Sequence, residues 1–130
     1  MIKLKLALDT NVFNNEKFCN WILQSREEKH LPAIVYMEYL HHHLKKGNTP
    51  SMVNAFLEQM NINIVPFGKN EAIKAAKYSV NNWKPVENPR EYIIGSTALL
   101  LNAKLVTNDI KNFKWIDKVI TPDELMKTPI

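Results

Sequence analysis

Hydrophobic and polar positions repeat along the chain with two periods, one typical of strands and one typical of helices. Alternating or wholly apolar runs predict four strands, and residues 31–33 form a short extended piece. Helical spacing predicts several helices, and proline marks the start of two of them, at Pro50 and Pro89. The strands are expected at 3–8, 62–67, 104–107 and 118–120, and the helices at 16–28, 34–46, from 50, at 69–83, at 89–102 and from 121.

Four of these helices carry an apolar stripe, which predicts the face that packs against the rest of the molecule. The helix over 89–102 is apolar on most sides and should be deeply buried. The stripes consist of Phe18, Cys19, Ile22 and Leu23; Met37, Leu40, His41 and Leu44; Val53, Phe56, Leu57 and Met60; and Ile73, Ala76, Val80 and Trp83.

Strands that alternate with helices predict an α/β layer fold around a parallel sheet. A length of 130 residues fits one domain, expected over 1–130. No apolar run is long enough to cross a bilayer, and the single cysteine, Cys19, cannot form an internal disulfide. A reducing cytoplasm is therefore the expected compartment. Ligands of parallel sheets gather at the carboxyl ends of the strands, so candidate site residues are those that follow a strand.

Four acidic residues lie where such a site would form. Asp9 follows the first strand and Asp109 follows the strand over 104–107. If these two strands are parallel neighbours, both carboxylates project into one crevice. Glu91 lies in the first turn of the buried helix, where the helix dipole favours an anion. Glu38 lies at the margin of the apolar stripe of its helix.

Carboxylates that crowd together repel one another, and each then resists ionisation. A hard divalent cation removes that conflict, because Mg²⁺ prefers carboxylate and water oxygens. Two such ions, roughly 3.5–4 Å apart, recur in enzymes that hydrolyse phosphodiesters. Each acid also has an ordinary structural interpretation as a turn or cap residue, a dipole partner or a surface charge. The metal hypothesis therefore depends on the four acids together.

Each acid stands in a segment with a recognisable sequence. The segments are LALDTN at 6–11, VYMEYL at 35–40, REYIIGSTA at 90–98, and LVTND at 105–109 with Asn112 and Phe113 after it. In order and spacing they resemble the acid-bearing segments of the PIN-domain ribonuclease family, in particular its VapC-like toxin nucleases. The resemblance covers nearly the whole chain, and the last segment is its most specific part.

The resemblance implies a three-layer α/β/α sandwich with a central parallel sheet, and cleavage of RNA that depends on Mg²⁺ or Mn²⁺. Thr10 and Asn11 would order the loop after the first strand, and Thr107 would be a polar neighbour of the metals. The family also implies a homodimer, with 18–23 and 53–60 as candidate contacts, and for a toxin a small antitoxin partner. The catalytic and metal-binding acids carried over from the family are Asp9, Glu38, Glu91 and Asp109.

One position departs from the family pattern, because the third acid is more often aspartate and here it is Glu91. Glutamate keeps the charge but reaches one methylene further, which would displace the metal and weaken activity or favour Mn²⁺. One turn later stands Gly95, at a cost of about 1 kcal/mol relative to alanine in a helix. Tight packing of this helix on the sheet, in preference to approach of the first-strand loop, is the expected reason.

The net charge of +4 and the pI of 9.2 permit a polyanionic partner without requiring one. Basic residues near the acid-bearing segments could hold an RNA backbone by sequence-independent attraction, although each alone is typical of a solvated surface. Trp83 and Trp115 could stack on unpaired bases, and Trp83 also fits an apolar stripe. The basic candidates are Lys45, Lys46, Lys84, Arg90, Lys111 and Lys114.

Other functions stay open beside a toxin nuclease. The chain could be an RNA-processing PIN nuclease without an antitoxin, or a non-catalytic RNA-binding module with a degenerate acidic site, which Glu91 favours. A phosphatase-like hydrolase with Asp9 as nucleophile needs an acid two residues later, where Asn11 stands. Cys19 on its stripe indicates a core thiol. The three histidines at 41–43 point in different directions on a helix and cannot all bind one ion, although His41 or His42 can border the site.

Overall fold

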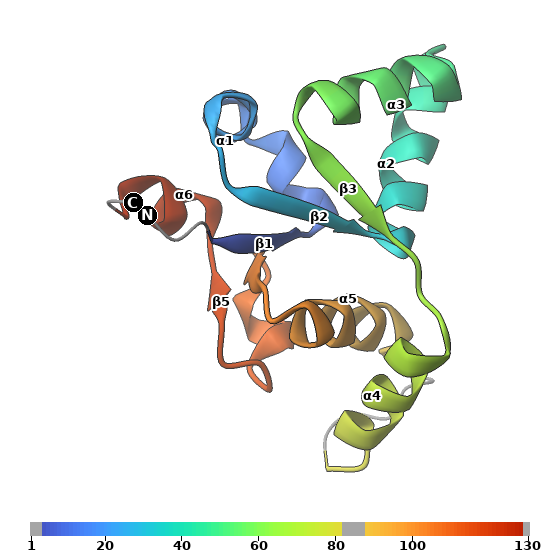
Figure 1. Ribbon diagram of the computed structural model, residues 1–130, viewed down its shortest axis with the longest axis vertical. Coiled ribbons are helices and arrows are strands. Elements are labelled where there is room, and N and C mark those ends of the chain that lie inside the picture. Colours follow the sequence, from blue (N-terminus) through green and yellow to red (C-terminus); the bar gives the residue numbers. More distant parts are fainter. Residues whose placement is uncertain (1–3, 82–87, 129–130) are drawn as a thin grey trace.

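The computed structural model describes residues 4–81 and 88–128, and these form a five-stranded sheet with helices on both sides (Figure 1). The strand order is β3-β2-β1-β4-β5, and every neighbouring pair is parallel. Because β1 is central, its side chains from Leu6 to Leu8 are buried on both faces. The strands are β1 (Lys5–Leu8), β2 (Glu28–Pro32), β3 (Ile62–Val65), β4 (Lys104–Val106) and β5 (Val119–Ile120).

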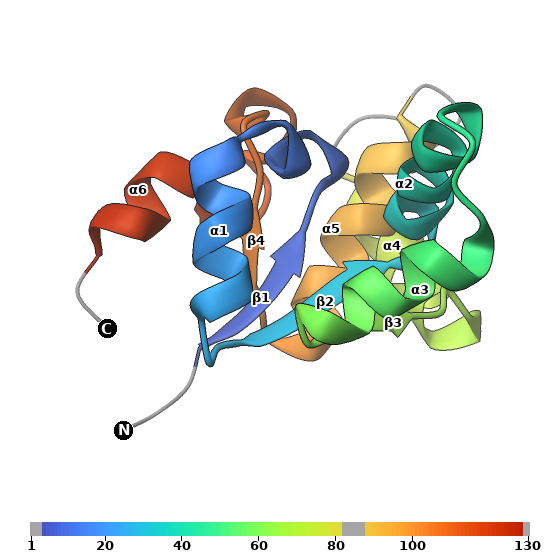
Figure 2. The ribbon, with the colours of Figure 1, turned by 90° about the horizontal axis from the view of Figure 1, so that it is seen from above.

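Helices cover the two faces of this sheet. Figure 1 shows α1 and α3 on one side and α4 and α5 on the other, while α2 rises from the end of β2. Figure 2 shows α6 beside α1, and α2 beside α5. The helices are α1 (Glu16–Gln24), α2 (Ala33–Lys45), α3 (Pro50–Gln59), α4 (Lys69–Ser79), α5 (Pro89–Leu101) and α6 (Pro122–Lys127), with short 3-10 turns η1 (Thr10–Asn14) and η2 (Ile110–Phe113). The layered α/β/α architecture with a central parallel sheet is thus confirmed.

Polar residues begin several helices by satisfying backbone N–H groups that have no partner within the helix. The side chain of Asn15 accepts from Phe18 N at the start of α1. Thr121 does the same for α6, where Glu124 returns a bond to the Thr121 backbone and completes a capping box. These helix starts agree with the sequence expectation. Among the described helices, none is long and apolar enough to cross a membrane.

The expectation for α5 is confirmed, because residues on most sides of this helix are buried. The reason for Gly95 is different from the expected one. A Cβ at Gly95 would lie 2.5 Å from the Trp115 ring and 2.6 Å from the Ile116 side chain. The residue that requires glycine is therefore the tryptophan after η2, and neither the sheet nor the first-strand loop. Trp115 also contacts the Tyr92 ring, at 5.1 Å between centroids, so its indole is packed against α5.

Several sequence expectations about elements were wrong. The helix expected over 16–28 ends at Gln24, and the segment expected as a short extended piece belongs to a full strand, β2. The stripe expected for α2 is largely exposed, and Val35 and Tyr39 are buried instead. On α4, Val80 is 78% exposed and Ala75 is the buried residue. Trp83 lies outside the described residues.

Strand β2 was missed because its first three residues, Glu28, Lys29 and His30, are polar, and one of them is a fully buried lysine. The ammonium of Lys29 donates to three backbone carbonyls, at 2.6 Å from Ile22 O, 2.9 Å from Ser25 O and 2.9 Å from Met60 O. Two of these carbonyls belong to the last turn and cap of α1, and the third to the cap of α3. Carbonyls at helix C-termini lack helical partners and carry partial negative charge, so one cation stabilises both ends.

Burial lowers the pKa of Lys29 from its ordinary value, and the nearby Glu27 carboxylate opposes that shift. The three carbonyl acceptors favour the charged form, because a neutral amine would leave part of this acceptor set without a donor. Lys29 therefore connects α1, β2 and α3 from inside the protein.

Replacement of Lys29 by methionine should destabilise the fold by about 3 kcal/mol, because three buried carbonyls lose their donor. Urea denaturation measures this effect, with the exposed Lys17→Met on α1 as the matched control. The control should unfold at the urea concentration of the wild type. Equal midpoints for Lys29→Met and Lys17→Met would contradict the structural role assigned to Lys29.

Candidate active site

The site is built around Asp9, at the carboxyl end of the central strand. Asp9 is fully buried, and its backbone N–H donates to Val106 O at 3.0 Å, which continues the β1–β4 ladder past the end of β1. Its Oδ1 accepts from Thr10 N at 2.7 Å and so caps η1, while its Oδ2 accepts from the Thr107 hydroxyl at 2.8 Å. The condition set by the sequence, that β1 and β4 are parallel neighbours, is met, since the two strands pair directly.

Thr107 and Asn11 connect the loops that follow these two strands. The buried Thr107 hydroxyl donates to Asp9 and accepts from Asp109 N at 3.0 Å. The Asn11 amide lies 3.4 Å from Asp9 Oδ2 and 3.3 Å from the Thr107 hydroxyl, and its carbonyl oxygen accepts from Asn108 N at 3.0 Å. The polar residues expected to order this loop thus hold Asp9 in one orientation.

Arg90, in the first turn of α5, connects Asp9 to the carboxylate of Glu38 on α2. Its Nη2 lies 2.5 Å from Asp9 Oδ1 and 2.9 Å from Glu38 Oε1, and its Nε lies 2.7 Å from Glu38 Oε2. The hydroxyl of Thr10 also donates to Glu38 Oε1. Two acids that are far apart in the sequence therefore meet around one cation.

The pairing changes the acid–base properties of both partners. Burial raises the pKa of Glu38, but hydrogen bonds from Arg90 and Thr10 and the charge of Arg90 outweigh it, so the pKa lies below its ordinary value. Hydrogen bonding to Glu38 raises the pKa of Arg90, with the charge of Asp9 adding to the shift and burial opposing it. The guanidinium and the Glu38 carboxylate are therefore both charged at neutral pH.

The other two candidate acids lie nearby but outside this pair. Asp109 follows β4 at the same sheet edge as Asp9, and its Oδ2 accepts from the Asn112 amide at 2.7 Å. Glu91 is half-buried in the first turn of α5. Within residues 4–81 and 88–128, no three His, Cys, Asp or Glu side chains are grouped as a metal site. The structure thus brings Asp9 and Glu38 together and leaves the convergence of all four acids as a prediction.

The role of Arg90 among the acids was missed in the sequence, where it was grouped with residues that could contact RNA. A signal for it was present. Arg90 follows Pro89 in the first turn of α5, where the positive end of the helix dipole disfavours a cation. A basic residue at such a place indicates an acidic partner from another element.

The other basic and aromatic candidates have different surroundings. Lys45 and Lys46 lie exposed at the end of α2, and Lys111 lies exposed on η2. Lys84 lies outside the described residues, and Lys114 is exposed. Trp115 is packed against Gly95 and Tyr92, which does not favour the expected stacking on bases.

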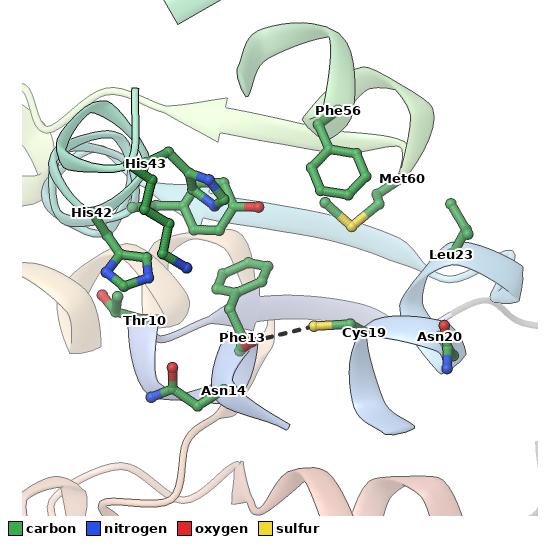
Figure 3. A pocket seen from close by; sticks show the side chains of 12 residues that line it. Thr10, Phe13, Asn14, Cys19, Asn20, Leu23, His42, His43, Phe56 and Met60 are labelled. Atoms are coloured by element: carbon green, nitrogen blue, oxygen red, sulfur yellow. Dashed lines mark hydrogen bonds between the residues drawn. The ribbon is translucent and has the colours of Figure 1, made fainter. Parts of the chain in front are cut away.

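A pocket of about 570 Å³ opens beside the acid pair, on the side of Thr10 (Figure 3). Aromatic and aliphatic side chains from η1, α1, α2 and α3 surround it, and His42 and Lys46 add polar groups. Cys19 lines this pocket and donates to Phe13 O at 3.4 Å. Because its side chain is only half-buried, it is not the expected core thiol. Burial, followed by the charge of Glu16, raises the pKa of Cys19. The remaining apolar lining residues are Leu23, Tyr39, Phe56 and Met60.

Comparison with protein families places this chain in the PIN-domain family, whose model matches residues 6–119. The match includes all four candidate acids, all but the first residue of β1, and the whole of β4. The family resemblance of the sequence is therefore confirmed. No match was found among curated protein sequences.

Solved structures show the same fold. A toxin–antitoxin complex from Klebsiella pneumoniae aligns with a TM-score of 0.71 at 21% identity, over 90% of this chain and 97% of that one. A DNA-bound VapBC from Salmonella typhimurium gives 0.66 at 19% identity, over 92% and 98%. VapBC-1 from nontypeable Haemophilus influenzae gives 0.63 at 20% identity, over 91% and 96%. At these identities the likeness establishes the fold.

The lowered pKa of Glu38 has a consequence for stability in acid. A carboxylate whose pKa is depressed by folding contributes stability above its ordinary pKa of 4.5, and this contribution is lost as the pH falls through the lower value in the folded protein. As the pH falls from about 6 to about 3, wild type should therefore lose more stability than Glu38→Gln. Urea denaturation in EDTA measures the difference, and the exposed Glu58→Gln should follow wild type. Identical acid sensitivity in all three proteins would contradict the pairing of Glu38 with Arg90.

Proposed function

We propose that this protein is a metal-dependent endoribonuclease that hydrolyses RNA phosphodiester bonds. The observation that carries the proposal is the pair of carboxylates, Asp9 and Glu38, that converge on one positive charge at the carboxyl end of the sheet. Membership of the PIN-domain family supports it. So does the position of Asp109 at the same edge, because ligands of parallel sheets gather there.

The residues at this edge fit Mg²⁺ or Mn²⁺. They offer carboxylate oxygens, which hard divalent cations prefer, and a guanidinium already stands where positive charge is needed. Asp9 and Glu38 would hold the ion, with Asp109 and Glu91 as further ligands. The ion would supply positive charge that lowers the pKa of water and stabilises negative charge on the phosphate.

The protein itself would orient the reacting groups. Thr107 and Asn11 fix the Asp9 carboxylate, so its direction is set before any ligand arrives. Lys45, Lys46 and Lys111 would attract the RNA backbone without reading its sequence. Direct attack of water on phosphorus would leave a 5′-phosphate and a 3′-hydroxyl.

Substitution Asp9→Asn should abolish cleavage of an end-labelled structured RNA in Mg²⁺ or Mn²⁺, by at least about a hundredfold, because it removes a charged ligand at the centre of the site. The exposed Asp117→Asn is the matched control and should cleave like wild type, and EDTA should stop both. Equal cleavage by wild type and Asp9→Asn would contradict the proposed site. No cleavage together with no Mn²⁺ binding would favour a non-catalytic RNA-binding module.

We further propose that the nuclease is the toxin of a toxin–antitoxin pair, with a small antitoxin as its partner. The similar solved structures include a toxin–antitoxin complex and VapBC assemblies, which supports this role. The pocket beside Thr10 also supports it, because Leu23 and Phe56 at its rim are 44% and 48% exposed. Large apolar side chains exposed around a pocket are typical of a surface that binds another protein.

Phe56→Glu should abolish co-purification with a short basic protein encoded beside this gene, because a charge at the pocket rim opposes apolar docking. Co-expression and affinity purification test this. The control is Met37→Glu, on a similarly exposed apolar residue of α2 outside the pocket lining. Unchanged capture by Phe56→Glu would overturn the proposed contact. The absence of any such neighbouring protein would favour an RNA-processing nuclease, and light scattering of the free protein would test the expected homodimer.

A further inference from the structure

We propose that Arg90 is an internal counter-ion of the carboxylate site, which must withdraw from Asp9 and Glu38 before a divalent cation binds there. The guanidinium of Arg90 thus competes with the metal ion for the carboxylates of Asp9 and Glu38. This inference rests on the proposed function, and it assigns to Arg90 a role in regulating metal loading of that site.

The first argument is the fit of the guanidinium to the carboxylates. Its Nη2 and Nε contact both oxygens of Glu38, and the same Nη2 contacts Asp9 Oδ1. This is the two-pronged arrangement that makes arginine–carboxylate pairs strong. Nη2 also lies 3.3 Å from the Thr10 hydroxyl. One side chain therefore holds both acids together on a single positive charge.

The second argument is that Arg90 uses the oxygens a metal would need. Asp9 and Glu38 together have four carboxylate oxygens, and Arg90 contacts three of them. The fourth, Asp9 Oδ2, accepts from Thr107 and Asn11. The other donors to the two carboxylates are hydroxyl, amide and backbone N–H groups. These groups are neutral and do not repel an incoming cation. Displacement of Arg90 is therefore the main cost of binding a divalent ion.

The third argument is that positive charge is unfavourable at the position of Arg90, and that its side chain has access to solvent. It lies in the first turn of α5, where the helix dipole disfavours positive charge, and a second cation would add repulsion. Its side chain is 30% exposed, whereas that of Asp9 is fully buried. When charges compete, the arginine moves toward solvent and the aspartate stays. If the site is free of Arg90 in about one to ten per cent of molecules, the apparent metal affinity falls by about ten- to a hundredfold.

The test is calorimetric titration of the whole protein with Mn²⁺, without RNA. Arg90→Gln should bind Mn²⁺ about ten- to a hundredfold more tightly than wild type, because the competing cation is gone. Arg90→Lys, which keeps a charge but loses the two-pronged contact, should fall between them. The exposed Arg26→Gln removes the same charge elsewhere and should bind like wild type.

A second measurement separates competition from a purely structural role. In EDTA, Arg90→Gln should melt at a lower temperature than wild type, since Asp9 and Glu38 then repel each other. Added Mn²⁺ should raise its melting temperature by more than that of wild type, because the same ion binds more tightly. If Arg90→Gln does not fold in EDTA, Arg90→Lys gives the same comparison.

Mn²⁺ affinity that is unchanged or weaker in both Arg90 variants would overturn the inference, as would no Mn²⁺ binding by any of the proteins. The RNA assay reports separately on the proposed function. Tighter Mn²⁺ binding by Arg90→Gln, without any RNA cleavage by wild type, would support the counter-ion role and contradict the proposed nuclease activity. Cleavage by wild type that depends on Asp9, without tighter Mn²⁺ binding by Arg90→Gln, would support the nuclease activity and contradict the counter-ion role.

Discussion

A negative charge buried at the end of the central strand is the constraint on which the rest of the site depends. Asp9 is inaccessible to solvent, and a carboxylate in such a place is stable only with charged and hydrogen-bonding partners. Its partners come from three separate stretches of chain: Thr10 and Asn11, Arg90, and Thr107. The direct pairing of β1 with β4 brings the last of them into reach. The topology of the sheet thus determines which side chains can compensate the charge of Asp9.

The sheet carries a second buried charge, and the contrast between the two is informative. Lys29 in β2 is satisfied by backbone carbonyls at the ends of two helices, which cannot leave without unfolding those ends. Asp9 is satisfied in part by Arg90, a flexible side chain that reaches solvent. Charge compensation by the backbone holds the architecture together. Charge compensation by a side chain can be exchanged for another cation, which is what a binding site requires.

How much the sequence predicts depends on whether a residue follows a local rule or a long-range one. The apolar run of β1, the proline and threonine helix starts and the buried α5 follow local rules and were predicted. Strand β2 was missed, because its polar residues include Lys29, whose acceptors lie on distant elements. Gly95 was recognised as unusual, but its cause, Trp115, follows a later turn of chain. At the site, Asp9, Glu38 and Thr107 were predicted from family segments, whereas the bridge by Arg90 depends on how α2 and α5 pack.

The geometry of α5 also bears on the glutamate at position 91. Successive residues of a helix point about 100° apart, so the side chain of Glu91 leaves α5 about 100° around the helix from that of Arg90, which contacts Asp9 and Glu38. Glutamate reaches one methylene further than the usual aspartate. If Arg90 withdraws and a metal takes its place, the longer side chain is the one able to turn back toward the ion. On the proposed function, the arginine at 90 and the glutamate at 91 would act in turn. The arginine would pair with the acids in the absence of metal, and the longer third acid would reach the ion once the arginine has moved.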